Sequence, residues 1–374
     1  MESTSNNIIR RILSRMITVG LMLVICLGLS GRPDVRAQAA NAGFYEGSIA
    51  QQFLSRSKAA GRVVRLLTPN SFWYVATTGD DGNSCQSSDT PCKTIQAAIT
   101  KAGAGDTVSV AAGTYQENLV AKDGVNLSGA GMFATIVDAG GVKQALYVPP
   151  FVTTTIQGMA FTNSGTGYDE GGNGFANAGV VLYYANATLT NCRVFNNAYF
   201  SGILSYYGTN TYAYNLVDHN VGYGIFLSMA SNDSVQNNTI TGNTSGGVAI
   251  YSSSSITATI LNNIIASNTG YGVDLIPDPT ATDPTYPAYS IDYNDFWDNS
   301  SGAANGSITL GTGNLALDPK FRSAGGNDYL LQADSPVIDM GDPASQYNDL
   351  DGTRNDMGAF PFLVIHLYLP VVIQ

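Results

Sequence analysis

One arginine, one aspartate and one histidine stand out in a middle segment that carries almost no basic side chains. Apart from His219, Arg193 is the only basic residue between positions 144 and 319, and Asp218 lies one repeat further along the chain. A guanidinium, a carboxylate and an imidazole could together abstract a proton beside a carboxylate group. The alternative is a solvated outer face with one surface ion pair, because a catalytic site needs convergent groups with perturbed pKa values. The sequence favours the ion pair.

A group of acidic residues lies near the C-terminal end. Asp349, Asp351 and Asp356 alternate around Gly352, and carboxylate oxygens arranged around a glycine can bind a calcium ion. The segment lacks the full calcium-binding loop and its closing glutamate. An Asp-Gly pair is equally typical of a turn. The sequence therefore favours a turn, with calcium binding as the alternative, and it requires no cofactor.

Alternating polarity in the middle of the chain predicts which strand residues point inward and which point outward. The predicted inward side chains are Val180, Leu182, Ile225, Leu227, Val248 and Ile250. The predicted outward side chains are Val181, Leu204, Phe226 and Ala249, followed by a column of Tyr183, Tyr206, Ser228 and Tyr251 that Tyr184 and Tyr207 extend. An outward stripe of this kind normally has a partner.

The outward rings suggest carbohydrate binding. Stacked coils would place them about 4.8 Å apart, which is close to the repeat of an extended glycan. The predicted carbohydrate-binding residues are Tyr183, Tyr206, Phe226 and Tyr251. The competing interpretation, which the sequence leaves open, is that a loop or the C-terminal tail covers this column.

A repeat of about 23 residues must position these side chains. Five nine-residue segments align without gaps at 189–197, 212–220, 235–243, 260–268 and 291–299. Each ends in asparagine, has an apolar or aromatic sixth residue, and in four of the five has asparagine at the fourth position. A second phrase, glycine followed by an apolar residue, begins at Gly179, Gly202, Gly224, Gly247 and Gly272.

This pattern predicts short strands separated by turns. Asparagine and glycine tolerate left-handed backbone geometry, and stacked asparagine amides can satisfy one another along a ladder. Helices are disfavoured in the repeat because β-branched residues, glycine and asparagine are all poor in helix interiors. Residues 94–102 alone have helical spacing, and they suit the N-terminal cap that a solenoid needs.

Both ends of the repeat region resemble a known family. Between Trp73 and Leu119, YVATTGDDGNSC and PCKTIQAAITKAGAGDTVSVAAGTYQENL resemble the cap and first coil of bacterial β-helix repeat proteins in the pectin-lyase-like superfamily. DPKF, YLLQADSPVIDMGDP and DLDGTRNDMGAF, between positions 318 and 360, are similar to the C-terminal module of exported β-helix proteins called choice-of-anchor. Here Pro361 follows, where such modules usually have an acidic residue.

The resemblance implies an all-β fold: a right-handed, single-stranded parallel β-helix with a short N-terminal capping helix. It covers roughly residues 72–360. It implies no particular reaction, because this fold hosts lyases, hydrolases, adhesins and inert surface proteins. The Gly-His-Gly phrase that its pectin hydrolases share is absent from this sequence, and their paired aspartates are absent from its repeat region.

The N-terminus has the pattern of a secretory signal. Arg10, Arg11 and Arg15 precede an apolar run at 17–29, and small residues follow at 35–39. The run is shorter than the roughly 20 residues that span a bilayer, so we expect cleavage rather than membrane anchoring. The predicted organisation is a signal peptide at 1–39, a linker at 40–71, a β-helix with its cap at 72–319, a closing module at 320–361 and an apolar tail at 362–374.

The cysteines fit an exported protein. Cys85 and Cys92 flank a short polar loop, and an oxidising compartment allows them to form a disulfide. Cys26 would leave with the signal peptide. Cys192 occupies a repeat position that otherwise holds asparagine, so we predict a buried free thiol.

Charge restricts the classes of partner. Removing residues 1–39 takes away five arginines and two acids, which leaves 12 basic and 26 acidic residues and a net charge of −14. Nucleic-acid binding needs basic surface and is excluded. The sequence favours a secreted or cell-surface protein that is not an enzyme, has no membrane span after cleavage, and contacts a polysaccharide or an envelope component. The alternative is a polysaccharide lyase or glycoside hydrolase acting on a pectin- or alginate-like polymer.

Overall fold

The computed structural model describes residues 71–165, 178–252, 257–277, 288–305 and 308–362, all within one compact unit. The predicted signal peptide, nearly all of the predicted linker, and the tail after Phe362 lie outside the described residues. No helix in the described ranges has the length and hydropathy needed to cross a membrane.

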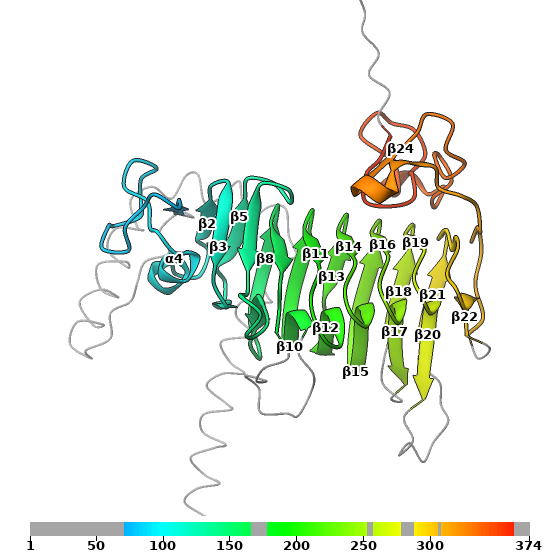
Figure 1. The fold of residues 1–374 in the computed structure, drawn as a ribbon, viewed down its shortest axis with the longest axis horizontal. Helices are drawn as coiled ribbons and strands as arrows, with labels where there is room; N and C mark the ends of the chain where they lie inside the picture. The colour runs from blue at the N-terminus through cyan, green and yellow to red at the C-terminus, as the bar shows by residue number, and fades with distance from the viewer. Residues whose placement is uncertain (1–70, 166–177, 253–256, 278–287, 306–307, 363–374) are drawn as a thin grey trace, which may run out of the picture. The chain divides into compact units, whose positions relative to one another are not determined.

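Parallel strands in three sheets form the body of the molecule, and Figure 1 shows them side by side in one long row. The first sheet contains β1 (Phe72–Val75), β2 (Thr107–Val110), β5 (Asn126–Gly129), β8 (Thr153–Gln157), β13 (Thr211–Ala213), β18 (Thr257–Leu261), β21 (Ala288–Asp292) and the ends of β10 and β15. The second contains β3 (Gly113–Gln116), β6 (Thr135–Asp138), β9 (Ala160–Thr162), β11 (Arg193–Phe195), β14 (Leu216–Asp218), β16 (Thr239–Thr241) and β19 (Ile264–Ala266). The third contains β4 (Leu119–Val120), β7 (Leu146–Val148), the starts of β10 (Ala178–Thr190) and β15 (Tyr223–Gln236), β12 (Ser201–Gly208), β17 (Gly246–Ser252), β20 (Tyr271–Pro277) and β22 (Gly302–Ala304).

Each strand pairs with the equivalent strand of the next coil. Leu189 is opposite Tyr212 in the first sheet, and Val194 is opposite Val217 in the second. The partners are 23 residues apart, so the register of the sheets reproduces the repeat of the sequence. The predicted all-β, parallel β-helix is confirmed.

The core lies inside the coils. All six side chains predicted to point inward are at most 1% exposed, and they pack into one continuous apolar cluster. Their burial supplies the main stabilisation, at about 25 cal/mol per Å² of apolar surface.

Two asparagine ladders hold the turns together. At Asn238, the backbone N–H and the side-chain Nδ2 both donate to Asn263 Oδ1 (2.8 and 3.0 Å), and Nδ2 also donates to the Tyr212 carbonyl (2.9 Å). One ladder contains Asn215, Asn238, Asn263, Asn294 and Asn314, and the other contains Asn197, Asn220, Asn243, Asn268 and Asn299. These bonds explain the two asparagine positions of the nine-residue repeat.

The residue before the first ladder adopts a left-handed backbone. The column runs Asn191, Tyr214, Asn237, Asn262 and Tyr293, with φ between 49° and 59°. Asparagine tolerates this conformation, whereas tyrosine is unusual there.

The N-terminal cap consists of helix α4 (Ile95–Lys101) and the disulfide Cys85–Cys92. The Thr94 hydroxyl accepts from Ala97 N–H, and the Glu117 carboxylate accepts from the N–H groups of Ile95 and Gln96. Both satisfy N–H groups that a helix start leaves free. The predicted helix and disulfide are confirmed.

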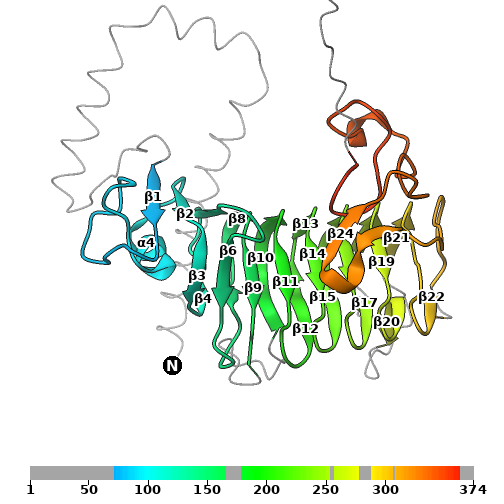
Figure 2. The same cartoon turned by 45° about the horizontal axis from the view of Figure 1, so that its top comes forward.

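The closing module does not continue the coils. It contains an antiparallel hairpin of β23 (Phe321–Ser323) and β24 (Asp328–Leu331), with 3-10 turns at Ala324–Gly326 and Ser345–Tyr347. Its end folds back onto β16 and β19 of the second sheet, where Ala359 N–H donates to Thr239 Oγ1 (3.1 Å) and Gly358 N–H donates to the Asn262 carbonyl (2.8 Å). Figures 1 and 2 both show the β24 region lying against this side of the row of strands. The likeness of this segment to a choice-of-anchor module stays a prediction.

Candidate functional site

Arg193 and Asp218 form a two-pronged ion pair between β11 and β14. Arg193 Nε lies 2.8 Å from Asp218 Oδ1, and Nη2 lies 2.6 Å from Oδ2. His219 Nδ1 lies 2.9 Å from the same Oδ2, and this hydrogen bond raises the pKa of His219. The sequence therefore identified a real contact.

The ion pair is buried, which corrects the prediction of a solvated surface pair. The Asp218 side chain is fully buried, and that of Arg193 is only 13% exposed. The Arg193 guanidinium carbon lies 4.1 Å from the centre of the Phe195 ring and 5.8 Å from that of Phe133. The guanidinium is therefore held on one side by a carboxylate and on its faces by aromatic rings.

The three aspartates of the alternative calcium site each accept different hydrogen bonds. Asp356 accepts backbone N–H bonds from Asp339 and Phe362 (both 2.6 Å), and Asp349 Oδ2 accepts one from Asp356 itself (2.8 Å). Asp351 Oδ1 accepts from the Thr353 hydroxyl (2.8 Å). Nowhere in the described ranges do three or more acidic, histidine or cysteine side chains form a group that could hold a metal ion. The hydrogen bonds of Asp356 and Asp349 connect separate segments of the closing module.

Phe226, one of the four predicted carbohydrate-binding residues, is covered. Its side chain is 5% exposed, and Leu204 and Ala249 of the same column are also buried. The rings of Phe200, Tyr223 and Tyr251 lie 4.5, 5.8 and 6.4 Å from it. Phe226 points out of the coil, as predicted. The sequence left open whether this position is exposed or covered, and it is covered because these neighbours form a second apolar cluster outside the coil.

The predicted row of four rings is also interrupted. Tyr183 pairs in register with Tyr206, Tyr206 with Ser228, and Ser228 with Tyr251. Phe226 belongs to the neighbouring column, opposite Leu204. Tyr183 and Tyr206 are half-buried and stack at 5.2 Å, whereas Tyr251 stands apart from them.

The structure instead gathers five rings at the turn between the third and first sheets. We call this group the aromatic block: Phe151, Tyr183, Tyr184, Tyr206 and Tyr207. Tyr184 and Tyr207 stack at 4.3 Å, and each meets its sequence neighbour edge to face at 4.8 Å. Phe151 lies 6.5 Å from Tyr184 and is 81% exposed. Burial and the neighbouring tyrosines raise the pKa of Tyr206 to about 12, so its hydroxyl stays neutral.

Phe151 was missed at the level of sequence because its coil is irregular. The Phe151 N–H donates to the Tyr184 carbonyl (2.8 Å), which places it at the same turn one coil earlier. The Pro149-Pro150-Phe151 turn could have been a signal, since it precedes a strand.

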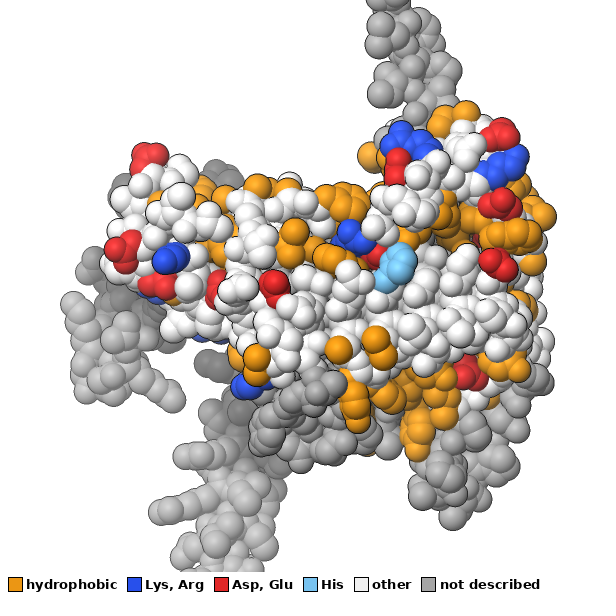
Figure 3. Space-filling view, in the orientation of Figure 1, with side chains coloured by type: hydrophobic (Ala, Val, Ile, Leu, Met, Phe, Trp, Pro, Cys, Tyr) orange, Lys and Arg blue, Asp and Glu red, His pale blue; other side chains and the backbone are white. Residues whose placement is uncertain are grey.

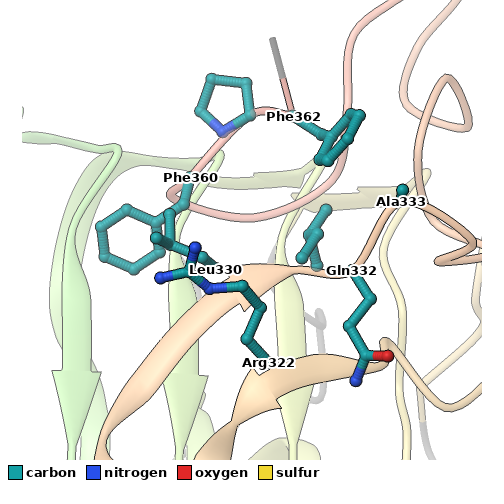
Figure 4. Close-up of a pocket in the computed structure, with 8 residues that line it drawn as sticks. Arg322, Leu330, Gln332, Ala333, Phe360 and Phe362 are labelled. Atoms are coloured by element: carbon teal, nitrogen blue, oxygen red, sulfur yellow. The ribbon is translucent and has the colours of Figure 1, made fainter. Parts of the chain in front are cut away.

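The closing module contributes to two of the cavities in the described part of the chain. One, of about 390 Å³, lies inside it, and Figure 4 shows Phe360 and Phe362 facing Arg322, Leu330 and Gln332 there. Arg322, the cationic residue among the described residues that line it, binds Asp328 Oδ2 at 2.7 Å. The other, of about 320 Å³, lies between the coils and the loop around Asp349.

The visible face of the coils is weakly charged. In Figure 3 most of it is backbone and side chains that are neither charged nor hydrophobic, with apolar groups between them and few charged side chains. This agrees with the 12% content of charged residues.

Residues 123–282 match the family described as right handed beta helix region. No match to a curated protein is found. Among solved structures, the chain is similar to pectate lyase Pel9A at 16% identity, covering 79% of this chain and 97% of that chain, with a TM-score of 0.45.

Two further solved structures are similar. One is an alginate lyase from Paenibacillus sp. str. FPU-7, at 13% identity over 65% of this chain and 95% of that chain, with a TM-score of 0.36. The other is a pectin methylesterase from Yersinia enterocolitica, at 13% identity over 61% and 94%, also with a TM-score of 0.36. At these values the likeness carries no argument about activity.

Proposed function

We propose, from the premise that this chain is a right-handed parallel β-helix protein, that it is exported and contacts carbohydrate through the aromatic block without catalysing a reaction. The predicted signal peptide and the Cys85–Cys92 disulfide support an oxidising, extracellular setting. The net charge of −14 after cleavage favours a polymer that is not itself acidic.

One observation carries the proposal: aromatic residues occupy a turn where the backbone favours asparagine or glycine. Phe151, Tyr184 and Tyr207 have φ of 64°, 50° and 51°. This conformation costs a side-chain-bearing residue about 1–2 kcal/mol, and such strain concentrates at functional sites. The same chain uses asparagine at comparable turns, for example at Asn191 and Asn237.

The block offers two kinds of contact to a sugar chain. The exposed Phe151 ring offers an open face, while Tyr184 and Tyr207 cover each other and present edges and hydroxyls. Rigid rings bind with little loss of side-chain entropy. The competing interpretation is that the rings only stabilise the coils.

The catalytic alternative has less support. A lyase or hydrolase built on Arg193 would need its guanidinium free to meet substrate. Two of its nitrogens bind Asp218 instead, and Asp218 is fully buried.

Tyr184→Asn tests the proposal. Asparagine suits the left-handed turn, so its backbone gain of about 1–2 kcal/mol offsets part of the lost ring contacts, which contribute about 0.5–1.5 kcal/mol for each ring pair. We expect a modest fall in Tm together with at least a tenfold loss of affinity, measured by electrophoresis through gels that contain xylan, β-glucan, pectin or alginate.

Tyr199→Asn is the matched control. Tyr199 is 54% exposed and has a φ of 102°, yet it lies outside the aromatic block. Its substitution should leave gel retardation unchanged. If no polymer retards the native protein, or if Tyr184→Asn lowers only the Tm, the rings are structural and the proposal fails.

A further inference from the structure

A preformed cavity of about 320 Å³ lies between the turns of the coils and the closing module. Asn191 and Tyr214, from successive coils, form one wall, and the loop Asn348, Asp349 and Leu350 forms the other. The volume is at the lower end of the range for small-molecule sites, roughly 300–1,000 Å³. The two walls are far apart in the sequence, so the cavity exists only because the closing module folds back.

Buried hydrogen bonds fix the two walls relative to each other. Asn237 Nδ2 donates to Asn355 Oδ1 (2.8 Å) and to the Asp356 carbonyl (3.0 Å). Asn355 Nδ2 in turn donates to Asp349 Oδ1 (3.2 Å), and Asp356 N–H donates to Asp349 Oδ2 (2.8 Å). The Asp349 carboxylate is therefore held in place before any ligand arrives.

Tyr214 gives the cavity an aromatic wall at a position where the backbone favours asparagine. Its φ is 57°, and the same turn of three other coils holds Asn191, Asn237 and Asn262. The other tyrosine of the column, Tyr293, lies under the Arg354 guanidinium at 5.7 Å. Tyr214 lines the cavity instead.

Charge restricts what the cavity can bind. Burial, together with Asp356 and Asp351, raises the pKa of Asp349 to about 6, so it is mostly ionised at neutral pH. None of the described residues that line the cavity is basic. Its carboxylate can accept hydrogen bonds from hydroxyl or ammonium groups and repels a bound carboxylate.

We propose that this cavity binds one sugar residue that is neutral or carries an amine, and that it rejects uronates. A ring face would pack on Tyr214, while hydroxyl or ammonium groups would donate to Asp349 and contact the Asn191 amide. The site is separate from the aromatic block and does not depend on it.

Three related monosaccharides test the proposal in the full chain. Glucosamine differs from glucose only at C2, and glucuronate differs from glucose only at C6. Their binding can be followed by ligand-observed NMR titration. We expect Kd values on the order of 1 mM for glucosamine and glucose, with glucosamine bound more tightly, and no binding of glucuronate at neutral pH. Asp349→Asn should weaken glucosamine more than glucose, because the ammonium group loses its carboxylate.

Variants within the same column give matched controls. Tyr214→Asn should reduce binding of both sugars at least tenfold, whereas Tyr293→Asn should not, since that ring lies elsewhere. Asn191→Gly, which keeps the turn, should weaken binding even if Tyr214→Asn folds poorly. Tyr184→Asn should leave these affinities intact, so failure here is distinguishable from failure of the aromatic block.

Several results would overturn the proposal. One is that neither glucose nor glucosamine shows saturable binding, and another is that glucuronate binds as tightly as they do. A third is that neither Tyr214→Asn nor Asn191→Gly changes the affinity for these sugars. Asp349-dependent binding of Ca²⁺ without sugar binding would also reject it, in favour of a cation site.

Discussion

The buried Asp218 carboxylate connects neighbouring side chains of two coils. It accepts from both Arg193 and His219, under a cover that includes the buried ring of Tyr329. Burial, with Asp218 nearby, raises the pKa of Tyr329 to about 12. Such a carboxylate is stable only while its partners remain.

Arg193→Ala should therefore destabilise the protein by about 3–5 kcal/mol, because it removes the guanidinium and leaves the buried carboxylate with His219 as its one side-chain partner among the described residues. Lys320→Ala is the control, since the Lys320–Asp334 pair is exposed (39% and 71%) and should cost less than about 1 kcal/mol. Urea unfolding of both variants measures the difference. Equal, small losses would mean that solvent reaches Asp218.

Asp295 makes the stability depend on pH. It is fully buried, Oδ1 accepts from Leu317 N–H (2.9 Å), and Oδ2 has no hydrogen-bond partner among the described residues. Burial raises its pKa to about 7. A raised pKa means that the folded state favours the protonated form, so this stabilisation is complete below about pH 4 and is lost as the pH rises through about 7.

The free energy of unfolding should accordingly fall by roughly a few kcal/mol between about pH 5 and about pH 8. Asp295→Asn mimics the protonated acid and should flatten that dependence. Urea unfolding across the interval measures it. A native protein that is equally stable at both ends would contradict the assignment.

At the scale of elements, Cys192 lies at the end of an asparagine ladder, next to its first member, Asn215. Its N–H donates to Asn215 Oδ1 (2.9 Å), as a ladder asparagine would, and its thiol contacts the Ile156 carbonyl at 3.6 Å. Ile156 pairs with Leu189, whose carbonyl accepts from the ladder amide of Asn215. The acceptors for one more amide are therefore already in place. Burial raises the pKa of this thiol to about 12, so it is unreactive.

Cys192→Asn should stabilise the protein by about 1 kcal/mol, because the new amide can donate to Ile156 and Asn215. Asn238→Ala, in the middle of the same ladder, should cost at least about 3 kcal/mol, since it leaves several buried groups without partners. Thermal unfolding ranks the two variants. Destabilisation by Cys192→Asn would show that the space at that position fits only a thiol.

At the scale of the whole molecule, the sequence predicts the features that recur in every coil. Inward residues such as Val180, the ladder asparagines and the capping helix follow from alternation and spacing, which are local rules. Even the Arg193–Asp218 contact follows from register, because the two residues lie one coil and two positions apart.

The sequence does not predict which side chains and segments cover the outside of the coils. Phe226 is buried by Phe200, which lies in a turn, and by Tyr223, whose partners in the neighbouring coils are Ser201 and Gly246. The period therefore predicts no ring at either position. The fold-back of the closing module depends on contacts such as Asn237–Asn355, more than a hundred residues apart. Long-range contacts of this kind leave no periodic signal in the chain.

Affinity as a function of oligosaccharide length tests the central claim, that the aromatic block binds a sugar chain, most directly. Its turn spans three successive coils, about 4.8 Å apart. With the glycan that retards the native protein most, calorimetry should show affinity that rises to about three sugar units and then levels off. Tyr184→Asn should abolish the rise. An affinity that is independent of length, or a rise that Tyr184→Asn leaves unchanged, would contradict the account.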